Sequence, residues 1–226
     1  MPQPELVKTE FHCHTCYSKD SLVTIQGLIS TCRKKSIHRL VITDHNTIQG
    51  ALIANKLNPE LFIVGEEIMT QQGEILAIFV KEQIPAGLPA VEAVELLRAQ
   101  GAFISVSHPF DSMRAGHWEM DDLLNIMSSI DAVEIFNSRC IDPKFNTLAS
   151  DFSQKYHLRG TVGSDSHTLG EVGKSTLTLP NFHDALTLKS ALIVAEPHVR
   201  QSSPWVHFLS SYARWRKQKQ AASNIR

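Results

Sequence analysis

The stretch LVKTEFHCHT, residues 6–15, decides the fold class, because a short apolar run ends in two residues that can bind metals. Residues 6–11 have the length and the β-branched content of a buried strand. Alternate residues of a strand point to the same side, so His12 and His14 face together and Cys13 points away. Two imidazoles at one strand end make a candidate metal site.

Further strand-like runs alternate with helical patterns along the chain. Apolar runs occur at residues 40–42, 61–64, 75–80, 103–106, 132–136 and 160–162. Helical patterns lie between them at residues 24–35, 47–57, 89–100, 121–127 and 143–156. Strands that alternate with helices pair in parallel through crossover connections. The sequence therefore predicts one α/β sheet or closed barrel of roughly seven strand–helix units.

Length and composition indicate one soluble domain. A chain of 226 residues with 42% hydrophobic and 20% charged residues is ordinary for a globular α/β protein. No stretch approaches the roughly 20 consecutive apolar residues of a membrane helix, and residues 1–10 lack the apolar centre of a signal peptide. We therefore expect a cytoplasmic protein that has no membrane partner. The net charge of -1 gives no general attraction to nucleic acid.

The tail, residues 197–226, differs from residues 1–196, in which we expect the barrel. Its aromatic residues recur at roughly helical spacing, and basic residues gather near its end: Trp205, Phe208, Tyr212, Trp215, Arg214, Arg216, Lys217 and Lys219. Such a tail could be an arm for nucleic acid or acidic lipid. An aromatic stripe is more often the inner face of a helix that packs on its own domain. We favour packing on the barrel.

Metal-binding residue types stand at the ends of nearly all these strand candidates. They are His12, His14, Asp20, Asp44, His45, Glu66, Glu67, Glu74, His108, Asn137, Asp165 and His167. The carboxyl ends of parallel strands share one face, so these side chains are expected to converge. Imidazole and carboxylate together suit zinc, manganese or iron. The histidines outside this set, which are His38, His157, His183, His198 and His207, are expected to be ordinary surface or core residues.

The Cys-x-x-Cys spacing of Cys13 and Cys16 offers a different interpretation, a redox pair or a zinc knuckle. A structural zinc site needs two further cysteine or histidine ligands in a similar arrangement. Cys32 and Cys140 stand alone in the sequence. We therefore favour small, partly buried thiols beside a site that the histidines make, and we expect no disulfides.

Five motifs in order resemble the PHP family, named after polymerase and histidinol phosphatase. They are His-x-His-Thr-x-Tyr-Ser at residues 12–18, Thr-Asp-His-Asn at 43–46, Gly-Glu-Glu-Ile at 65–68, Ser-His-Pro at 107–109 and Gly-Ser-Asp-Ser-His at 163–167. The resemblance covers roughly residues 7–180. It implies a distorted, TIM-like (β/α)7 barrel, two to three divalent metal ions and hydrolysis of phosphoesters.

The resemblance also implies a ligand set. His12, His14, Glu67 and Asp165 would bind one metal, Glu67 and His108 a second, and Asp20, His45 and His167 a third. Two positions depart from the family pattern. Glu74 stands in the region where many members have a histidine, so either Glu74 is the ligand or the second metal is held more loosely. Lys19 stands where the acidic residue is commonest, and Asp20 follows it.

Further residues are candidates for catalysis and substrate binding. A water molecule activated by the metals would attack phosphorus, which makes the metals the main catalysts. Asp44 either orients the imidazole of a ligand or caps a turn or helix after it. Arg139, just beyond a strand end, could bind phosphate through two hydrogen bonds. Arg114 and His117 are weaker candidates for the same role.

These observations leave three classes of function. The first is a phosphatase or phosphodiesterase that acts on a nucleotide, the end of an oligonucleotide or another small phosphorylated metabolite. The second is a metal-dependent hydrolase of a different bond, because fold alone does not fix the reaction. The third is a non-catalytic module of a larger assembly. The nearly complete ligand set favours the first class, whereas the oligomeric state is left open.

Overall fold

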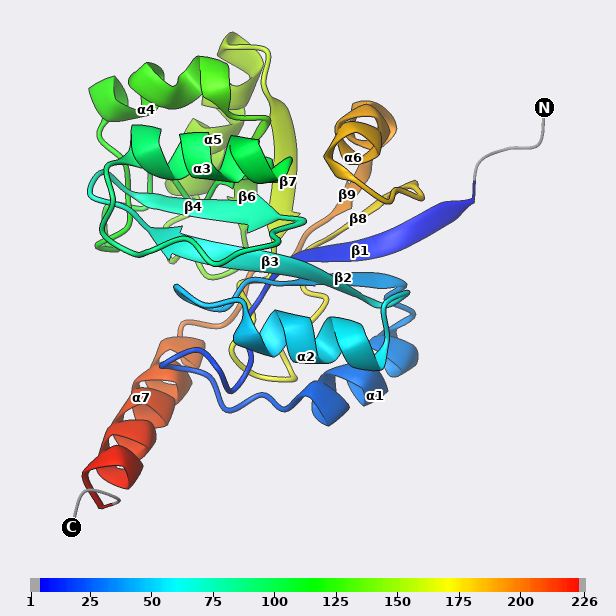
Figure 1. The fold of residues 1–226 in the computed structure, drawn as a ribbon, viewed down its shortest axis with the longest axis vertical. Helices are drawn as coiled ribbons and strands as arrows, with labels where there is room; N and C mark the ends of the chain where they lie inside the picture. The colour runs from blue at the N-terminus through cyan, green and yellow to red at the C-terminus, as the bar shows by residue number, and fades with distance from the viewer. Residues whose placement is uncertain (1–4, 224–226) are drawn as a thin grey trace.

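Nine strands form a single curved sheet in the computed structural model, which describes residues 5–223 (Figure 1). The strands follow the order β7-β6-β5-β4-β3-β2-β1-β8-β9 across the sheet. Their bounds are β1 Leu6–Cys13, β2 Arg39–Ile42, β3 Phe62–Met69, β4 Glu74–Ile78, β5 Phe103–Val106, β6 Ala132–Asn137, β7 Arg159–Gly163, β8 Thr176–Pro180 and β9 Glu196–His198. The sheet is nearly closed, which confirms the expected distorted barrel.

Seven α-helices accompany the sheet within the described residues (Figure 1). They are α1 Ile25–Lys35, α2 Gln49–Leu57, α3 Ala90–Gln100, α4 Met120–Ile126, α5 Lys144–Lys155, α6 Ala185–Ala191 and α7 Val206–Ser223. The first five match the helices expected from sequence. Local signals set their ends: Thr24 accepts a hydrogen bond from the amide of Gly27 at the start of α1, and Gly101 ends α3 with φ of 76°.

Strand direction departs from the expected parallel pairing at β4. This strand runs antiparallel to both β3 and β5, whereas β1, β2 and β3 pair in parallel, as do β5, β6 and β7. The connection from β3 to β4 is too short for a crossover helix, so the two strands form a hairpin. The reversal places Glu74, the first residue of β4, at the edge where the parallel strands end. All-parallel pairing was therefore the wrong expectation.

The first strand closes the barrel by pairing with two different partners. Its amino-terminal half pairs antiparallel with β8, a strand that the sequence reading missed. Its carboxyl end instead meets the segment after β7: the amide of His14 donates to the Ser166 carbonyl at 2.9 Å, and the amide of Ser166 donates to the His12 carbonyl at 3.2 Å. The two His/Asp-rich segments, residues 12–14 and 165–167, are thereby side by side.

Apolar side chains fill the space between the sheet and the helices. Leu28 and Cys32 of α1 pack with Leu40 and Ile42 of β2, and all four are fully or almost fully buried. A second cluster joins α3, α4 and α5 to the other half of the sheet. Burial of one such leucine or isoleucine contributes about 1.5–3 kcal/mol. This packing makes the sheet a rigid frame for the residues at its rim.

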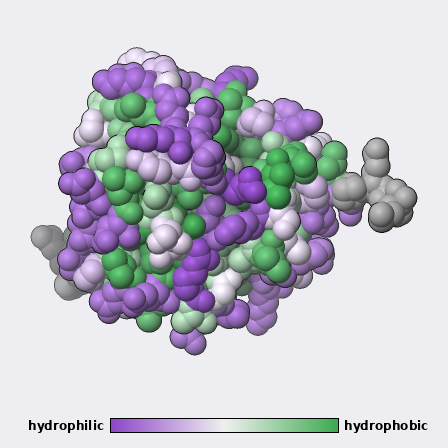
Figure 2. All heavy atoms as spheres, turned by 90° about the horizontal axis from the view of Figure 1, so that it is seen from above, coloured by the Kyte–Doolittle hydropathy of each residue, from purple (hydrophilic) through white to green (hydrophobic). Residues whose placement is uncertain are grey.

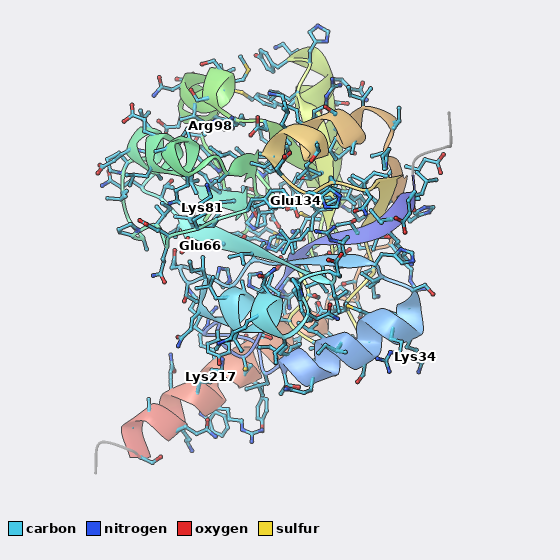
Figure 3. All side chains as sticks on the ribbon, turned by 45° about the vertical axis from the view of Figure 1, so that its right-hand side comes forward. Lys34, Glu66, Lys81, Arg98, Glu134 and Lys217 are labelled. Atoms are coloured by element: carbon cyan, nitrogen blue, oxygen red, sulfur yellow. The ribbon has the colours of Figure 1, made fainter. Side chains whose placement is uncertain are left out.

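The last helix, α7, extends from the lower end of the barrel in Figure 1. It touches the barrel through polar side chains: Arg214 pairs with Asp20 at 3.3 Å, and the ammonium group of Lys217 donates to the Cys16 carbonyl at 2.6 Å. Figure 3 labels Lys217 at this junction. The aromatic residues are exposed instead, which corrects our expectation that they pack on the barrel. The division at residue 197 stays a prediction, although β9 spans it.

The face opposite α7 mixes hydrophilic and hydrophobic residues in small patches (Figure 2). Scattered apolar residues of this kind are normal for protein surfaces. Among residues 5–223, no helix is both long enough and apolar enough to cross a bilayer.

Candidate metal centre

The structure brings the nine candidate metal ligands together at the rim where the parallel strands end. Eight of them are buried, and the ninth, His45, is 14% exposed at its side chain. The set consists of His12, His14, Asp20, His45, Glu67, Glu74, His108, Asp165 and His167. Three groups of ligand atoms within this set are close enough to hold an ion. The distances divide the set into three neighbouring parts.

The first part gathers two imidazoles and two carboxylates. The Nε2 atoms of His12 and His14 lie 3.1 Å apart, Glu67 Oε1 lies 3.3 Å from that of His12, and Glu67 Oε2 lies 3.3 Å from that of His14. Asp165 Oδ1 lies 3.5 Å from the first imidazole and 3.2 Å from the second. Ligand atoms about 2.1 Å from a tetrahedral ion are about 3.4 Å from one another. These four side chains can therefore hold one ion without a large rearrangement.

The second part shares Glu67 with the first. His108 Nε2 lies 3.2 Å from Glu67 Oε1 and 3.5 Å from Glu74 Oε2. On the other side, His45 Nδ1 lies 3.0 Å from Glu67 Oε2 and 3.7 Å from Glu74 Oε1. Glu74 thus offers one carboxylate oxygen to each of these two imidazoles. A carboxylate shared between two sets of ligands is suited to bridging two ions.

The third part is built around Asp20. Its Oδ2 lies 3.6 Å from His45 Nε2, and its Oδ1 lies 3.4 Å from His167 Nε2. His45 therefore faces the second part with one nitrogen and the third part with the other. The imidazole of His14 stacks beside both rings, with centroids 4.5 Å from His45 and 4.2 Å from His167. All three parts of the site are within contact distance of one another.

Glu134, which the sequence reading missed, orients two of the candidate ligands (Figure 3). Its Oε1 lies 2.9 Å from His12 Nδ1, and its Oε2 accepts the backbone amide of His108 at 2.9 Å and the side-chain amide of Asn137 at 3.0 Å. A carboxylate on the far nitrogen fixes the ring orientation of a metal-binding histidine and raises its basicity. A bulge in β6 between Glu134 and Phe136 lets Glu134 and Asn137 both face the site.

Glu10 supports the opposite side of the site from inside β1. Its carboxylate accepts the amides of Ser164 and Gly173 at 2.9 and 2.8 Å, and burial raises the pKa of this group to about 7. These bonds fix the segment that carries Asp165. One signal for Glu10 was present in the sequence: Glu10, His12 and His14 alternate along one strand and so share one side.

The charges of the site favour cations. Although burial opposes it, the imidazoles of His12 and His45 hold the pKa of Glu67 well below its usual range. Burial and the nearby His167 and His45 lower the pKa of His14 to about 3, which keeps its imidazole neutral. The neutral form is the one that binds metals. Four carboxylates, those of Asp20, Glu67, Glu74 and Asp165, would balance two divalent ions.

Two further observations fit bound metal. Glu67 Oε2 and Asp20 Oδ1 are buried and have no hydrogen-bond partner within the described part of the chain, which is costly for carboxylate oxygens. The backbones of His108 and Asp165 lie in the left-handed region, with φ of 24° and 51°. Such strain in non-glycine residues gathers at functional sites. The donor set and the unmatched oxygens are thus those of a metal centre.

Asp44 neither orients a ligand imidazole nor caps a turn or helix, which were the two roles that we expected. Its two carboxylate oxygens accept the amide and the hydroxyl of Thr15, each at 2.6 Å. Within residues 5–223 it makes no hydrogen bond to a ligand imidazole and does not cap α2, where Ile48 precedes the helix, although its Oδ2 lies against Gly50 in the first turn. Asp44 therefore fixes the loop that follows His14, and through that loop it supports the site.

The three candidate residues for substrate binding lie in different environments. Arg139 is buried, and its guanidinium is occupied by His167 Nδ1 at 2.8 Å, by Glu171 at 3.1 Å and by Val206 and Ser210 of α7. Arg114 is 22% exposed and bonds Asp165 Oδ2 at 2.6 Å. His117 bonds the Arg114 carbonyl and does not line the cavity at the metal centre. Arg114 is therefore the guanidinium best placed to meet a ligand.

A cavity of about 470 Å³ opens directly above the ligands. Its wall holds the basic side chains of Lys19, Arg114, Arg139 and Arg214 and the apolar side chains of Met69, Met113 and Ile141. Residues of α7 complete it: His207, Ser210, Ser211 and Arg214. We had expected His207 to be an ordinary residue, and its place at the cavity depends on how α7 docks.

The cysteines take no part in this site. All four are free, with Cys16 exposed and the others buried. Among residues 5–223, no cysteine belongs to a group of possible metal ligands. The zinc-knuckle interpretation of Cys13 and Cys16 was therefore wrong.

Comparison with known proteins identifies relatives that are similar to this chain in sequence or in fold. Residues 10–99 match the family described as PHP domain, and residues 143–189 match the family described as PHP-associated. A protein of Methanocaldococcus jannaschii, itself uncharacterised, is 37% identical over 172 residues, which cover 75% of this chain and 69% of that protein.

Solved structures with the same fold are more distant in sequence. A two-domain protein of Bacteroides vulgatus, described as containing a predicted PHP-like metal-dependent phosphoesterase, aligns with a TM-score of 0.67 and 17% identity over 88% of this chain and 67% of that one. A lesion-specific endonuclease of Pyrococcus furiosus aligns with a TM-score of 0.59 and 15% identity over 88% of this chain and 60% of that one. At these identities the likeness concerns the fold.

Proposed function

Since the chain belongs to the PHP domain family, we propose that it is a metal-dependent phosphoesterase that hydrolyses a phosphate ester at the rim of the barrel. One observation carries the proposal: ligand atoms of His12, His14 and Glu67 are close enough to share one ion, and Glu67 joins them to a second set formed with His108 and Glu74. Two joined sets of ligands suit displacement at phosphorus, in which the attacking and leaving oxygens both need stabilisation.

When bound, two or three divalent ions of zinc, manganese or iron would lower the pKa of a water molecule and supply positive charge for the phosphoryl oxygens. The protein side chains position the metal ligands. Glu134 holds the ring of His12 so that Nε2 points into the site. Glu67 and Asp165 present carboxylate oxygens to the same point from β3 and from the segment after β7.

Arg114 is the residue that we assign to substrate phosphate. Its guanidinium lies at the wall of the cavity, partly exposed, and one of its nitrogens bonds the outer oxygen of Asp165. Its Nε also donates to Asp111 at 3.0 Å, and its second terminal nitrogen lies 3.4 Å from Asn137 Oδ1. These contacts fix the guanidinium next to the site where phosphorus would react, and the second N–H of each terminal nitrogen can donate to phosphoryl oxygens. Arg139, by contrast, is buried, and its terminal nitrogens already make hydrogen bonds to His167, Val206 and Ser210.

The substrate class that we propose is a nucleotide, a nucleic-acid end or another small phosphorylated compound. The cavity is lined by basic residues, which favour an anionic group near the metals: Lys19, Arg114, Arg139 and Arg214. The apolar side chains of Met69, Met113 and Ile141 offer a surface for a base or another flat group on the same wall.

The test is hydrolysis of p-nitrophenyl phosphate and bis-p-nitrophenyl phosphate by protein loaded with Mn²⁺ or Zn²⁺. We expect turnover that a chelator abolishes and that added metal restores. The His12→Ala variant should lose metal and activity together. Metal-loaded protein that hydrolyses no phosphate ester would contradict the proposal, and cleavage of an amide or lactone instead would place the chain in a different class of hydrolase.

A further inference from the structure

The outer face of α7 carries aromatic and basic side chains together. Phe208, Tyr212 and Trp215 are 66%, 51% and 50% exposed, and Trp205 just before the helix is 73% exposed. Residues 208, 212, 215, 216 and 219 follow the spacing of one helix face, so Arg216 and Lys219 share that face with the aromatic rings. The Lys219 ammonium group lies 4.5 Å from the centre of the Trp215 ring.

The charge of α7 limits what can cover this face. The helix contains four basic residues, Arg214, Arg216, Lys217 and Lys219, and no acidic residue. Two copies of α7 packed together would bring these like charges near one another, which is unfavourable. A partner with many negative charges would be attracted to the same face.

The mixing of rings and charges favours nucleic acid over a membrane. A helix that lies on a bilayer separates an apolar face from a charged face. Here the cations lie among the rings. Proteins that bind single-stranded nucleic acid combine stacking of bases on aromatic rings with basic groups that neutralise the phosphates. The outer face of α7 has both elements on one surface.

The same helix also forms one wall of the metal cavity. Ser211 lines the cavity, and on the helix it lies one turn from both Phe208 and Trp215. Arg214, on the inner side, lies 3.3 Å from Asp20. A strand stacked along the outer face of α7 would therefore run past the mouth of the cavity.

We propose that the outer face of α7 binds single-stranded nucleic acid and guides its phosphates toward the metal cavity. The binding itself stands on the composition and exposure of α7. The role of the bound strand as substrate rests on the proposed phosphoesterase function.

The experiment measures binding in the presence of a chelator, so that hydrolysis plays no part. The full chain is titrated into a fluorescein-labelled oligothymidylate of about 15 nucleotides, and anisotropy is recorded at several salt concentrations. We expect binding that weakens with salt. The pair Arg216→Gln and Lys219→Gln should reduce the slope of log K against log salt by about 1.4, which is about 0.7 for each charge.

Two ring variants separate stacking from general apolar contact. The pair Tyr212→Leu and Trp215→Leu should weaken binding by about tenfold or more for each ring, because leucine keeps apolar area and cannot stack on a base. The pair Tyr212→Phe and Trp215→Phe should bind nearly as well as the unchanged protein. As a matched control, the pair Lys144→Gln and Lys155→Gln removes two exposed charges from α5 and should leave binding unchanged.

Several outcomes would overturn the inference. They are no binding at low salt, full binding by the leucine pair, or binding to phosphatidylserine vesicles with none to the oligonucleotide. Each of these would leave the phosphoesterase proposal standing, because that proposal is tested on small esters. Conversely, the protein could bind the oligonucleotide in the presence of chelator and show no esterase activity. That result would support the binding surface and contradict the proposed phosphoesterase function.

Discussion

At the scale of single residues, the site depends on side chains that touch the ligands as much as on the ligands themselves. Glu134 is the clearest case, because one carboxylate bonds the ring of His12, the amide of His108 and the side chain of Asn137. If this carboxylate is lost, a ligand ring can rotate and the backbone amide of another ligand loses its acceptor.

Glu134→Gln should therefore lower metal affinity or activity by about 10–100-fold, the usual cost of removing such a partner. Metal content can be measured by mass spectrometry after dialysis, together with turnover of p-nitrophenyl phosphate. Glu119→Gln, at an exposed position, is the matched control and should change neither. Unchanged metal content and unchanged turnover in Glu134→Gln would show that the contact with His12 contributes neither to metal binding nor to catalysis.

Arg114→Ala tests the residue assigned to phosphate. We expect KM for a phosphate ester to rise about tenfold, because a charged hydrogen bond contributes about 1.5–3 kcal/mol. Metal content should hold, because removal of a cation beside Asp165 leaves the ligand set more negative. Loss of metal with unchanged KM would show that Arg114 only positions Asp165 and does not bind the substrate phosphate.

The nine candidate ligands could be found from sequence because they stand at strand ends and inside motifs. The interactions of Arg139 could not. Its place just beyond a strand end predicted a free guanidinium, yet α7, more than 60 residues later in the chain, supplies two of its partners. Glu134 was missed for a similar reason, since its partners His12 and His108 come from other strands. Contacts between distant segments leave no local pattern in the sequence.

At the scale of elements, the position of Glu74 shows how strand direction matters. A first residue of a parallel strand would lie at the opposite edge from the ligands, and only the reversal of β4 brings Glu74 to His108. The apolar run predicted a strand but not its direction, because direction depends on which neighbours it pairs with. The strands β8 and β9 follow the last predicted unit. They were missed because β8 alternates threonine with leucine instead of forming an apolar run, and β9 has only three residues, all exposed.

Arg139 joins α7 to the barrel, and its replacement tests that junction. Arg139→Ala leaves Glu171 buried without its partner and removes two bonds to α7, so we expect a loss of stability of about 3–5 kcal/mol. Trypsin should also cleave α7, which is rich in arginine and lysine, faster than in the unchanged protein. Lys144→Ala removes an exposed charge as the control. Unchanged cleavage of α7 would mean that other contacts suffice to hold it.

Asp131 joins three elements and gives stability a defined pH dependence. Its carboxylate accepts Arg98 of α3 at 2.7 Å, the Ile104 amide of β5 at 3.0 Å and Lys189 of α6 at 3.1 Å. Although burial opposes it, these partners lower the pKa of Asp131 in the folded state. The stabilisation is therefore complete above the unfolded pKa of about 3.9 and is lost as pH falls below it.

Asp131→Asn should accordingly cost about 1–3 kcal/mol in urea denaturation near neutral pH. The difference between the variant and the unchanged protein should stay constant down to about pH 5 and shrink below about pH 4. Asp142→Asn, at an exposed pair with Lys144, is the control and should change stability little. A difference that grows as pH falls would contradict the assigned direction of the pKa shift.

At the scale of the whole molecule, the metal centre joins parts of the chain that are far apart in sequence. The first part of the site takes residues from the end of β1, from β3 and from the segment after β7, and His14 and Ser166 meet there to close the barrel. The carboxylates gathered at this seam repel one another unless cations balance them. Bound metal should therefore stabilise the closed barrel as well as the site.

Chelation should lower the melting temperature of the unchanged protein. Metal at about 100 times its dissociation constant adds about 2.7 kcal/mol, and for a chain of this size each kcal/mol shifts the midpoint by about 2–4 °C. A rise of about 5–11 °C on addition of Mn²⁺ or Zn²⁺ to chelated protein is thus expected by calorimetry. The His12→Ala and Glu67→Gln double variant, which lacks two of the four candidate ligands of the first part, should show little of this rise. An equal rise in both proteins would place the stabilising metal away from the rim, and the closure between His14 and Ser166 would then hold through backbone hydrogen bonds and packing alone.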